Sequence, residues 1–313
     1  MCSMRVRSVV FLVALTSANL SVPQETVVPV EVARTDTYSE GPVFDKDGNL
    51  YVSHDRFISR VAPDGNVQIW AETGAPSGHK ILADGTHIVC DFELVRLDAA
   101  GKFLETVATD CGGQPIRKTN DLTLDSLGGV YFTDPGVATE GALEDEKGKL
   151  CYVDADGATH LVAEKLGFPN GVILTPDGET LLVGEAMPGR NRILQFPVVS
   201  PGKVGDSHVF AELPSPPDDR FVSPDGMAFD RDGRLYVAHY GMGQIQVFDL
   251  EGRLVQSLPA GNTAVSNLAF GGPEMNQLYI TGSRDFFDTS LPGFVYRLDL
   301  KNVQGLPVQP SAR

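Results

Sequence analysis

Basic side chains are scarce in this chain of 313 residues, which has 25 Lys and Arg against 41 Asp and Glu. The formal net charge of −16 excludes the positive surface with which general nucleic-acid binders hold phosphate groups. Long apolar runs are missing beyond the N-terminal segment, so a multi-span membrane protein does not fit. Hydrophobic residues still make up 42% of the chain. That share is typical of a folded globular protein and excludes a disordered one.

Cysteine is also scarce. Cys2 lies in the N-terminal segment, and only Cys90, Cys111 and Cys151 follow it. Three remaining thiols allow at most one disulfide within the chain, and the sequence leaves its pairing open. The spacing of these cysteines matches no zinc-binding pattern. Gly-x-Ser-x-Gly, Walker, Gly-x-Gly-x-x-Gly and His-Glu-x-x-His motifs are absent as well, so serine-hydrolase, nucleotide-binding and zincin functions have no support.

The first residues are typical of an export signal. Arg5 and Arg7 precede the apolar run Val9–Leu15, and Thr16–Ala18 supplies the small residues that signal peptidase accepts. We expect residues 1–18 to be cleaved and the mature protein to be periplasmic or secreted, with no stable membrane anchor. The alternative is an uncleaved anchor, but the run is shorter than the ~20 residues that span a bilayer.

The chain contains an internal repeat that its turns reveal. It has 33 Gly and 21 Pro, an excess that indicates many turns. Three segments share one pattern, a short apolar strand, an Asp-Gly turn and a second strand; they are Glu40–Tyr51, Asn170–Leu181 and Asp225–Tyr236. Weaker copies begin at Ser77, Asn120 and Ser266. Successive starts lie 37 to 55 residues apart, which suits a four-stranded propeller blade.

Six such hairpins predict an all-β fold, a six-bladed β-propeller in a single domain over residues 19–313. Its blades start near residues 40, 77, 120, 170, 225 and 266. No segment has a persuasive helical period. The strand-forming segment Val27–Val32 is expected to supply the outer strand of the last blade and so close the ring.

The residues that begin the repeats are candidate metal ligands. The first strand of each blade lines the central channel, so these residues form a ring at one mouth; they are Glu40, Ser77, Asn120, Asn170, Asp225 and Ser266. Carboxylate and amide oxygens suit a hard cation such as calcium or magnesium. The alternative is that Asn-Gly and Asp-Gly are merely turns. Each of these repeats, however, has a separate hairpin turn seven residues further on.

A second set of candidates ends the second strand of each hairpin. Because the two strands are antiparallel, the end of the second returns to the mouth where the first began. Fourteen residues after the starts lie His54, Asp91, Asp134 and His239. We expect this set to contact substrate at the rim, the alternative being side chains that are solvated or locally hydrogen-bonded.

At these positions the chain resembles the SMP-30/gluconolactonase family, also called regucalcin-like. The matching motifs are Ser39–Pro42, Thr119–Leu122 with Tyr131–Pro135, Phe168–Gly171, Ser223–Met227 and Phe270–Glu274. They follow the family's order over nearly all of the mature chain. The resemblance implies a six-bladed propeller with one divalent cation in the channel, usually calcium, and lactone hydrolysis in many members.

The resemblance also implies roles for single residues. The family's metal-binding Glu, Asn and Asp fall on Glu40, Asn170 and Asp225, three of the six ring residues. Its Asn near metal and substrate falls on Asn120. The family often has Arg two residues before that Asn, where this chain has Lys118, with Arg117 one further back. This departure leaves open which basic residue meets the substrate.

The expected function is hydrolysis of a small sugar lactone. A divalent cation, calcium before zinc, magnesium or manganese, would polarise the lactone carbonyl, and Asp225 would be ligand and general base together. One alternative is a calcium-dependent phosphotriesterase or arylesterase, and another is a non-catalytic calcium-binding propeller. The sequence leaves the particular lactone and the oligomeric state open.

Overall fold

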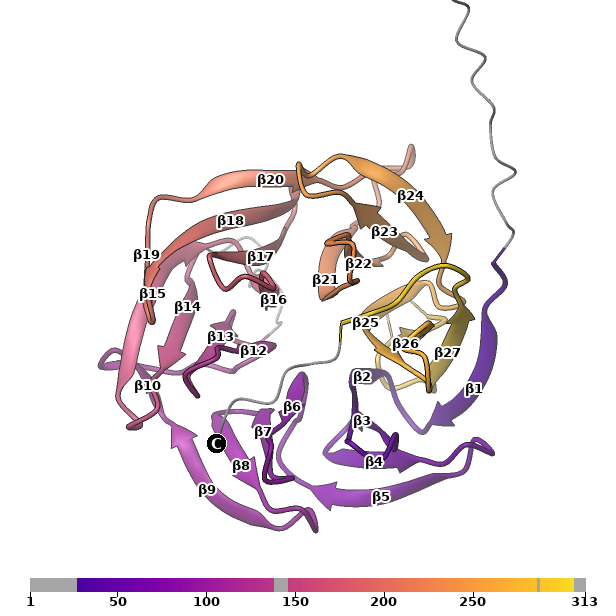
Figure 1. Ribbon diagram of the computed structural model, residues 1–313, viewed down its shortest axis with the longest axis horizontal. Helices are drawn as coiled ribbons and strands as arrows, with labels where there is room; N and C mark the ends of the chain where they lie inside the picture. The colour runs from indigo at the N-terminus through magenta and orange to yellow at the C-terminus, as the bar shows by residue number, and fades with distance from the viewer. Residues whose placement is uncertain (1–26, 138–145, 286–287, 307–313) are drawn as a thin grey trace, which may run out of the picture.

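The protein is a ring of β-sheets around a central axis (Figure 1). The computed structural model describes residues 27–137, 146–285 and 288–306. Within those ranges the chain forms strands and no helix, and hence no helix that could cross a membrane. The predicted six-bladed β-propeller is confirmed, whereas the predicted signal peptide at 1–18 lies outside the described residues.

The first three blades follow one another along the chain, each an antiparallel sheet in sequence order. Blade 1 consists of β2 (Ser39–Phe44), β3 (Leu50–His54), β4 (Phe57–Val61) and β5 (Val67–Glu72). Blade 2 consists of β6 (His79–Ile81), β7 (His87–Cys90), β8 (Leu94–Leu97) and β9 (Phe103–Ala108). A short ribbon follows, made of β10 (Asp110–Cys111) and β11 (Gln114–Pro115). Blade 3 consists of β12 (Leu122–Leu124), β13 (Val130–Asp134), β14 (Gly148–Val153) and β15 (Thr159–Leu166).

The other three blades complete the ring. Blade 4 consists of β16 (Pro169–Leu174), β17 (Thr180–Met187), β18 (Arg190–Ser200), the extra β19 (Lys203–Val204) and β20 (His208–Glu212). Blade 5 consists of β21 (Ser223–Phe229), β22 (Leu235–Tyr240), β23 (Gln244–Phe248) and β24 (Leu254–Pro259). Blade 6 consists of β25 (Ala264–Gly271), β26 (Gln277–Ser283), β27 (Gly293–Asp299) and β1 (Val30–Thr35).

Blade 6 joins the two ends of the chain. β1 pairs with β27 in antiparallel register, from Val30 opposite Arg297 to Thr35 opposite Gly293. The sequence predicted this closure from the segment Val27–Val32, and the observed strand begins three residues later. Pairing the first strand with the last closes the ring, with β1 as the outer strand of blade 6.

Apolar residues pack between neighbouring blades. Every residue of β3 is buried, because both faces of the sheet meet another blade. Val52 of blade 1 packs in one cluster with Val295 of blade 6. Between blades 5 and 6 the rings of Tyr236 and Phe270 meet edge to face, with centroids 5.1 Å apart. The core is therefore a series of such layers around the axis.

An aspartate at the start of the hairpin turn stabilises the turn by accepting main-chain hydrogen bonds. In blade 1, Asp45 Oδ1 accepts hydrogen bonds from the main-chain N–H groups of Asp47 and Asn49, at 2.9 and 2.8 Å. Gly48 in that turn has φ of 80°, a left-handed conformation that favours glycine. In blade 5, Asp230 Oδ1 likewise accepts a hydrogen bond from the main-chain N–H group of Asp232, at 3.0 Å. These contacts explain why the Asp-Gly pattern revealed the repeat.

One disulfide links the β10–β11 ribbon to blade 3. Cys111 and Cys151 are bonded, and Cys90 is a buried free thiol. The structure thus fixes the pairing that the sequence left open. A bond across a separation of 40 residues contributes about 2–4 kcal/mol to the free energy of unfolding.

Blade 2 buries an unusual imidazole. His87 packs against Trp70 and Tyr51, with ring centroids 4.2 and 5.1 Å away. Its Nδ1 is buried and has no hydrogen-bond partner in the described part of the chain. Burial lowers the pKa of His87 from its ordinary value of 6.5 to about 4. The folded protein therefore keeps this ring neutral at pH values where the unfolded chain protonates it.

Acid should consequently destabilise the fold through His87. Below pH 6.5 the unfolded chain binds a proton that the folded chain refuses until about pH 4, so the free energy of unfolding falls across this window. A shift of this size corresponds to roughly 3 kcal/mol. We predict that His87→Phe removes about that much from the loss of stability between pH 7 and pH 4, measured by urea unfolding at both pH values. An unchanged pH dependence in the variant would contradict this account.

Candidate functional site

The mouth of the channel is built from strands that are bulged where they begin. The pairing of β2 with β3 shifts register between Glu40 and Val43, and that of β21 with β22 shifts between Pro224 and Met227. β16 and β25 have the same irregularity. A bulge re-aims the side chains beside it and is common near functional sites. The plain hairpins that the sequence predicted did not include these bulges.

The three residues predicted as metal ligands come together at this mouth. Glu40 comes from blade 1, Asn170 from blade 4 and Asp225 from blade 5. The Asn170 amide donates a hydrogen bond to the Asp225 carboxylate, and the charges of Glu40 and Asp225 act on each other. Asn170 Oδ1 is buried and has no hydrogen-bond partner among the residues described.

In the protein alone, the ionised forms of the carboxylates at the mouth are electrostatically unfavourable. Burial raises the pKa of Glu40 to about 7, and the charge of Asp121 adds to the rise. Burial also raises the pKa of Asp225 well above its ordinary value, and the charges of Glu40 and Asp121 raise it further. The pKa of Asp121 is itself raised by burial. Three neighbouring carboxylates thus oppose one another's ionisation.

A divalent cation fits this arrangement. A cation would favour the ionised carboxylates and would give the orphaned Asn170 Oδ1 a partner. Over the ranges that the structure covers, no three His, Cys, Asp or Glu side chains form a metal cluster by themselves. A site here therefore depends on the amide oxygen of Asn170 beside the carboxylates of Glu40 and Asp225, a donor set suited to calcium or magnesium.

The rest of the predicted ring is not a uniform set of ligands. Ser266 Oγ donates to the carbonyl oxygen of Ser39 at 2.7 Å and so ties blade 6 to blade 1. Ser77 is buried, and Asn120 is half-buried beside the mouth. The carbonyl of Asn120 accepts a hydrogen bond of 2.9 Å from Gly78 of blade 2. Of the six, Glu40, Asn170 and Asp225 come together as candidate cation ligands, and the other three line the channel or connect its blades.

Two further site residues stand one position after the predicted ring. Asp121 follows Asn120, and Asn267, which follows Ser266, donates a side-chain hydrogen bond to Glu40. The sequence contains a signal for them that the ring prediction missed. In four repeats this position is glycine (Gly41, Gly78, Gly171 and Gly226), and only blades 3 and 6 have a polar side chain there.

Glycine in one blade makes room for the polar residue of the next. A Cβ on Gly78 would lie 2.3 Å from Asp121 Oδ1. A Cβ on Gly226 would lie 2.0 Å from Asn267 Oδ1. These distances are shorter than any van der Waals contact, so each glycine is required for the close approach of its neighbour.

Aromatic residues border the carboxylates on the side of blades 5 and 1. The Tyr38 hydroxyl lies 3.5 Å from Glu40 Oε1 and donates to it. The Tyr38 ring meets Tyr240 at a centroid distance of 6.4 Å, and Tyr240 meets Phe221 at 6.3 Å. Burial raises the pKa of Tyr240 to about 12, with a contribution from Asp225. Both tyrosines therefore remain neutral hydrogen-bond donors beside the carboxylates.

The two candidate basic residues point in different directions. Lys118 Nζ donates to the carbonyl oxygen of Ala75 at 3.2 Å. Burial lowers the pKa of Lys118, and the charges of Asp91 and Glu40 only partly oppose this shift. Arg117 is exposed, and its guanidinium donates to the carbonyl oxygen of Lys147 at 3.3 Å. Lys118 thus faces the carboxylates at the mouth, whereas Arg117 lies further out.

The predicted aspartates of the rim fix the loops that carry the mouth residues. Asp134 is fully buried, pairs with Lys149 at 2.9 Å and accepts the main-chain N–H groups of Arg117 and Lys118. Asp91 accepts the N–H group of Ala75, the residue that holds the Lys118 amine. Both carboxylates therefore position Lys118 from within the protein.

The predicted histidines of the rim are buried inside their blades. His54 Nε2 is hydrogen-bonded to Ser59 Oγ at 2.8 Å. The two ring nitrogens of His239 lie 3.1 Å from the side-chain amide of Gln246 and 3.3 Å from that of Asn191. Direct contact of His54, His239 or Asp134 with substrate stays a prediction.

Residues 38–284 match the model of the SMP-30/gluconolactonase/LRE-like region. The chain belongs to this family. Among curated relatives, a gluconolactonase of Zymomonas mobilis is 27% identical over 303 residues, covering 86% of this chain and 83% of that protein. A lactonase drp35 of Staphylococcus saprophyticus is 31% identical over 247 residues, covering 74% and 72%. A diisopropyl-fluorophosphatase of Loligo vulgaris is 25% identical over 240 residues, covering 68% and 76%.

Solved structures of relatives share the fold. A gluconolactonase from Xanthomonas campestris superposes with a TM-score of 0.73 at 25% identity, covering 88% of this chain and 90% of the other. A regucalcin from Agrobacterium tumefaciens, described as a calcium-binding protein, has a TM-score of 0.76 at 20% identity, covering 92% and 98%. At the level of the family, the chain is similar to hydrolases of lactones.

The glycine that accommodates Asn267 gives a test of the site. In Gly226→Ala the new methyl group would displace the Asn267 side chain and break its hydrogen bond to Glu40. Since hydrogen bonds to charged groups contribute about 1.5–3 kcal/mol, we predict at least a roughly tenfold loss of calcium affinity, measured by titration calorimetry.

Gly205→Ala is the matched control, because the nearest atom to its Cβ would be 3.9 Å away. It should keep the affinity of the original chain. Equal affinities in the two folded variants would show that Asn267 does not support Glu40.

Proposed function

We propose that the protein is a metal-dependent lactonase that opens a sugar lactone, with calcium or another divalent cation held by Glu40, Asn170 and Asp225. The observation that supports this most is the buried Asn170 Oδ1, which has no hydrogen-bond partner among the described residues and lies beside Asp225, whose pKa the charge of Glu40 raises. Lactonases among the relatives of 27 and 31% identity support the choice of substrate class.

Asp225 is the proposed general base. When bound, the cation supplies Lewis-acid polarisation of the lactone carbonyl. Asp225 accepts a proton from the water as it attacks the carbonyl carbon, and returns that proton to the ring oxygen when the ester C–O bond breaks. The hydrogen bond from Asn170 holds the carboxylate in one orientation during this transfer.

The polar residues around the carboxylates are proposed to position the substrate. Lys118 offers an ammonium group from the side of blades 2 and 3, and Asn120 offers an amide from the same loop. Lys118 is the preferred basic contact near the cation, because Arg117 faces outward. Sugar hydroxyl and carbonyl oxygens are natural acceptors for both groups.

Export to the periplasm or the medium is part of the proposal. It rests on the N-terminal pattern at 1–18. The disulfide between Cys111 and Cys151 supports it, since such bonds persist in oxidising compartments and are rare in the cytosol.

A phosphotriesterase activity is the second candidate. It is favoured by the relative from Loligo vulgaris, whose name describes hydrolysis of a fluorophosphate. The same cation and base would serve an attack of water on phosphorus, so assays on both substrate types separate the two activities. Calcium binding without any turnover would instead indicate the non-catalytic propeller.

Replacement of the base tests the proposed chemistry. Asp225→Asn keeps the shape of the side chain and removes both the negative charge and the proton acceptor. We predict a fall in kcat of about 10²–10⁴-fold on every lactone that the original protein opens, measured by pH-stat titration of the released acid.

The same preparations should be assayed on glucono-δ-lactone and on diisopropyl fluorophosphate. Turnover of the fluorophosphate alone would replace the lactonase by the second candidate. Undiminished lactone hydrolysis by a folded Asp225→Asn variant would show that Asp225 is not the base.

A further inference from the structure

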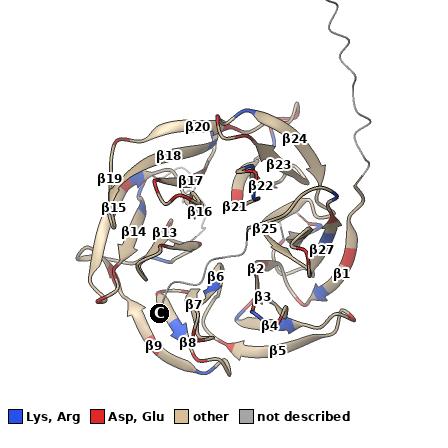
Figure 2. Ribbon diagram, in the orientation of Figure 1, with Lys and Arg blue, Asp and Glu red and all other residues tan. Residues whose placement is uncertain are grey.

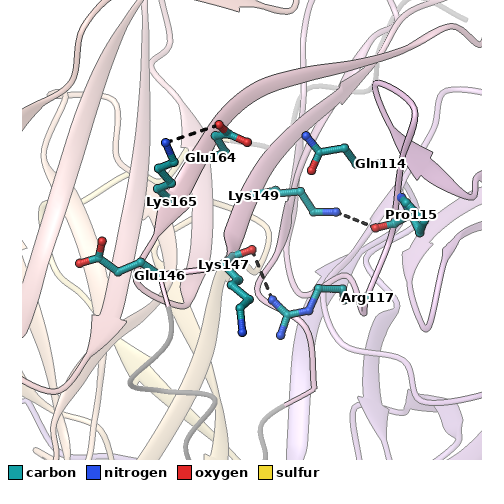
Figure 3. Close-up of a pocket in the computed structure, with 8 residues that line it drawn as sticks. All are labelled: Gln114, Pro115, Arg117, Glu146, Lys147, Lys149, Glu164 and Lys165. Atoms are coloured by element: carbon teal, nitrogen blue, oxygen red, sulfur yellow. Dashed lines mark hydrogen bonds and ion pairs between the residues drawn. The ribbon is translucent and has the colours of Figure 1, made fainter.

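A pocket of about 620 Å³ lies in blade 3, beside the mouth of the channel. Figure 3 shows its lining side chains, which come from β11, from the loops before β12 and before β14, and from β14 and β15. Six of them are charged: the basic Arg117, Lys147, Lys149 and Lys165 and the acidic Glu146 and Glu164. Its volume is in the range of small-molecule sites.

The pocket opens on the same face as the cation site. β13 ends at the mouth with Asp134, β14 begins there, and β15 returns to it. Arg117, on the pocket wall, is the chain neighbour of Lys118, and consecutive Cα atoms are ~3.8 Å apart. Asp134 accepts the N–H groups of both residues, so one buried carboxylate fixes the pocket wall and the Lys118 loop together.

The net charge of the side chains that line this pocket is opposite in sign to the net charge of the whole protein. Four basic and two acidic side chains give it a net charge of +2, whereas the chain has −16. Acidic segments occur all around the ring in Figure 2. A local positive hollow in an acidic surface concentrates small anions at that point.

The acidic members of the pocket are already engaged. Glu146 pairs with Arg190, which comes from blade 4. Glu164 pairs with Lys165 at 4.0 Å, a long and exposed contact that is easily exchanged for another anion. Lys149 is committed to Asp134 and to the carbonyl oxygen of Pro115 (Figure 3).

Three basic side chains of the pocket are exposed: Arg117, Lys147 and Lys165. They come from three different segments and line one hollow. Ammonium and guanidinium groups bind carboxylate and phosphate oxygens through charge-assisted hydrogen bonds.

We propose that this pocket binds an anionic group at the far end of the substrate, so that the protein prefers lactones carrying a carboxylate or a phosphate over neutral ones. The inference rests on the proposed lactonase function for its substrate. Binding of an anion to the pocket can be measured separately, without any turnover of a lactone.

The experiment compares Lys147→Gln/Lys165→Gln with the original protein. Substrates are neutral glucono-δ-lactone, a lactone with a free carboxylate and a lactone with a phosphate ester. The original protein should have the higher kcat/KM on at least one anionic lactone. In the double variant the ratio of anionic to neutral kcat/KM should fall about tenfold, chiefly through KM, because the pocket binds a group that does not react.

Arg34→Gln/Arg56→Gln is the matched control. Arg56 lies in the turn between β3 and β4 and Arg34 lies near the end of β1, both at the same face of the ring, so this variant also loses two positive charges, outside the pocket. It should leave the ratio unchanged. An equal fall of the ratio in both variants would show a general electrostatic effect and would overturn the proposal that the pocket binds the anionic group.

Inorganic phosphate and glucarate serve as non-reacting probes in titration calorimetry, and they distinguish a phosphate site from a carboxylate site. Binding of one probe to the original protein and its loss in the double variant would support the pocket even if no lactone were opened, in which case only the proposed function fails. Lactone hydrolysis without anion preference and without probe binding would overturn the inference alone.

Discussion

The electrostatic repulsion between the half-buried Glu40 and the buried Asp225 at the mouth is the constraint on which the site depends. Glu40 and Asp225 belong to blades 1 and 5, so they meet only because β1 pairs with β27 and closes blade 6 between them. Buried like charges cost free energy unless they are compensated. Hydrogen bonds from Asn170, Asn267 and the Gly41 main chain provide part of the compensation. A divalent cation would provide the remainder.

The blades differ around the channel because some residues depart from the repeated sequence pattern. Each blade supplies a first strand to the channel, but Gly78 and Gly226, at the second position of their repeats, open space for Asp121 and Asn267 of the next blades. Aromatic rings border the carboxylates on one side, and Lys118 with the basic pocket of blade 3 lies on the other. A substrate bound at the mouth would therefore meet aromatic rings on one side and basic groups on the other, which suits a molecule with chemically different ends.

The repeat predicted the fold because hairpin turns are encoded locally. Asp45 and Gly48 form their turn from nearby main-chain groups, so their pattern is readable without the rest of the molecule. Ring closure was predicted from the strand-forming segment Val27–Val32. Counting repeats led to the six ring positions, and only the resemblance to the family singled out Glu40, Asn170 and Asp225 as expected ligands. The contacts of Asp134, His54 and His239 were not readable, because they depend on which loop or strand packs against them. The disulfide was equally hidden, since three thiols in one layer of core left several pairings open.

The central claim is that Glu40, Asn170 and Asp225 hold one cation that activates a lactone. The most direct test is a crystal structure of the mature protein grown with calcium, with the ion located by anomalous scattering. The account predicts a single ion at the mouth, with oxygen atoms of all three side chains about 2.3–2.6 Å away and Asn170 Oδ1 as one of them. A mouth without an ion at saturating calcium, or an ion bound without Asn170 and Asp225, would contradict it.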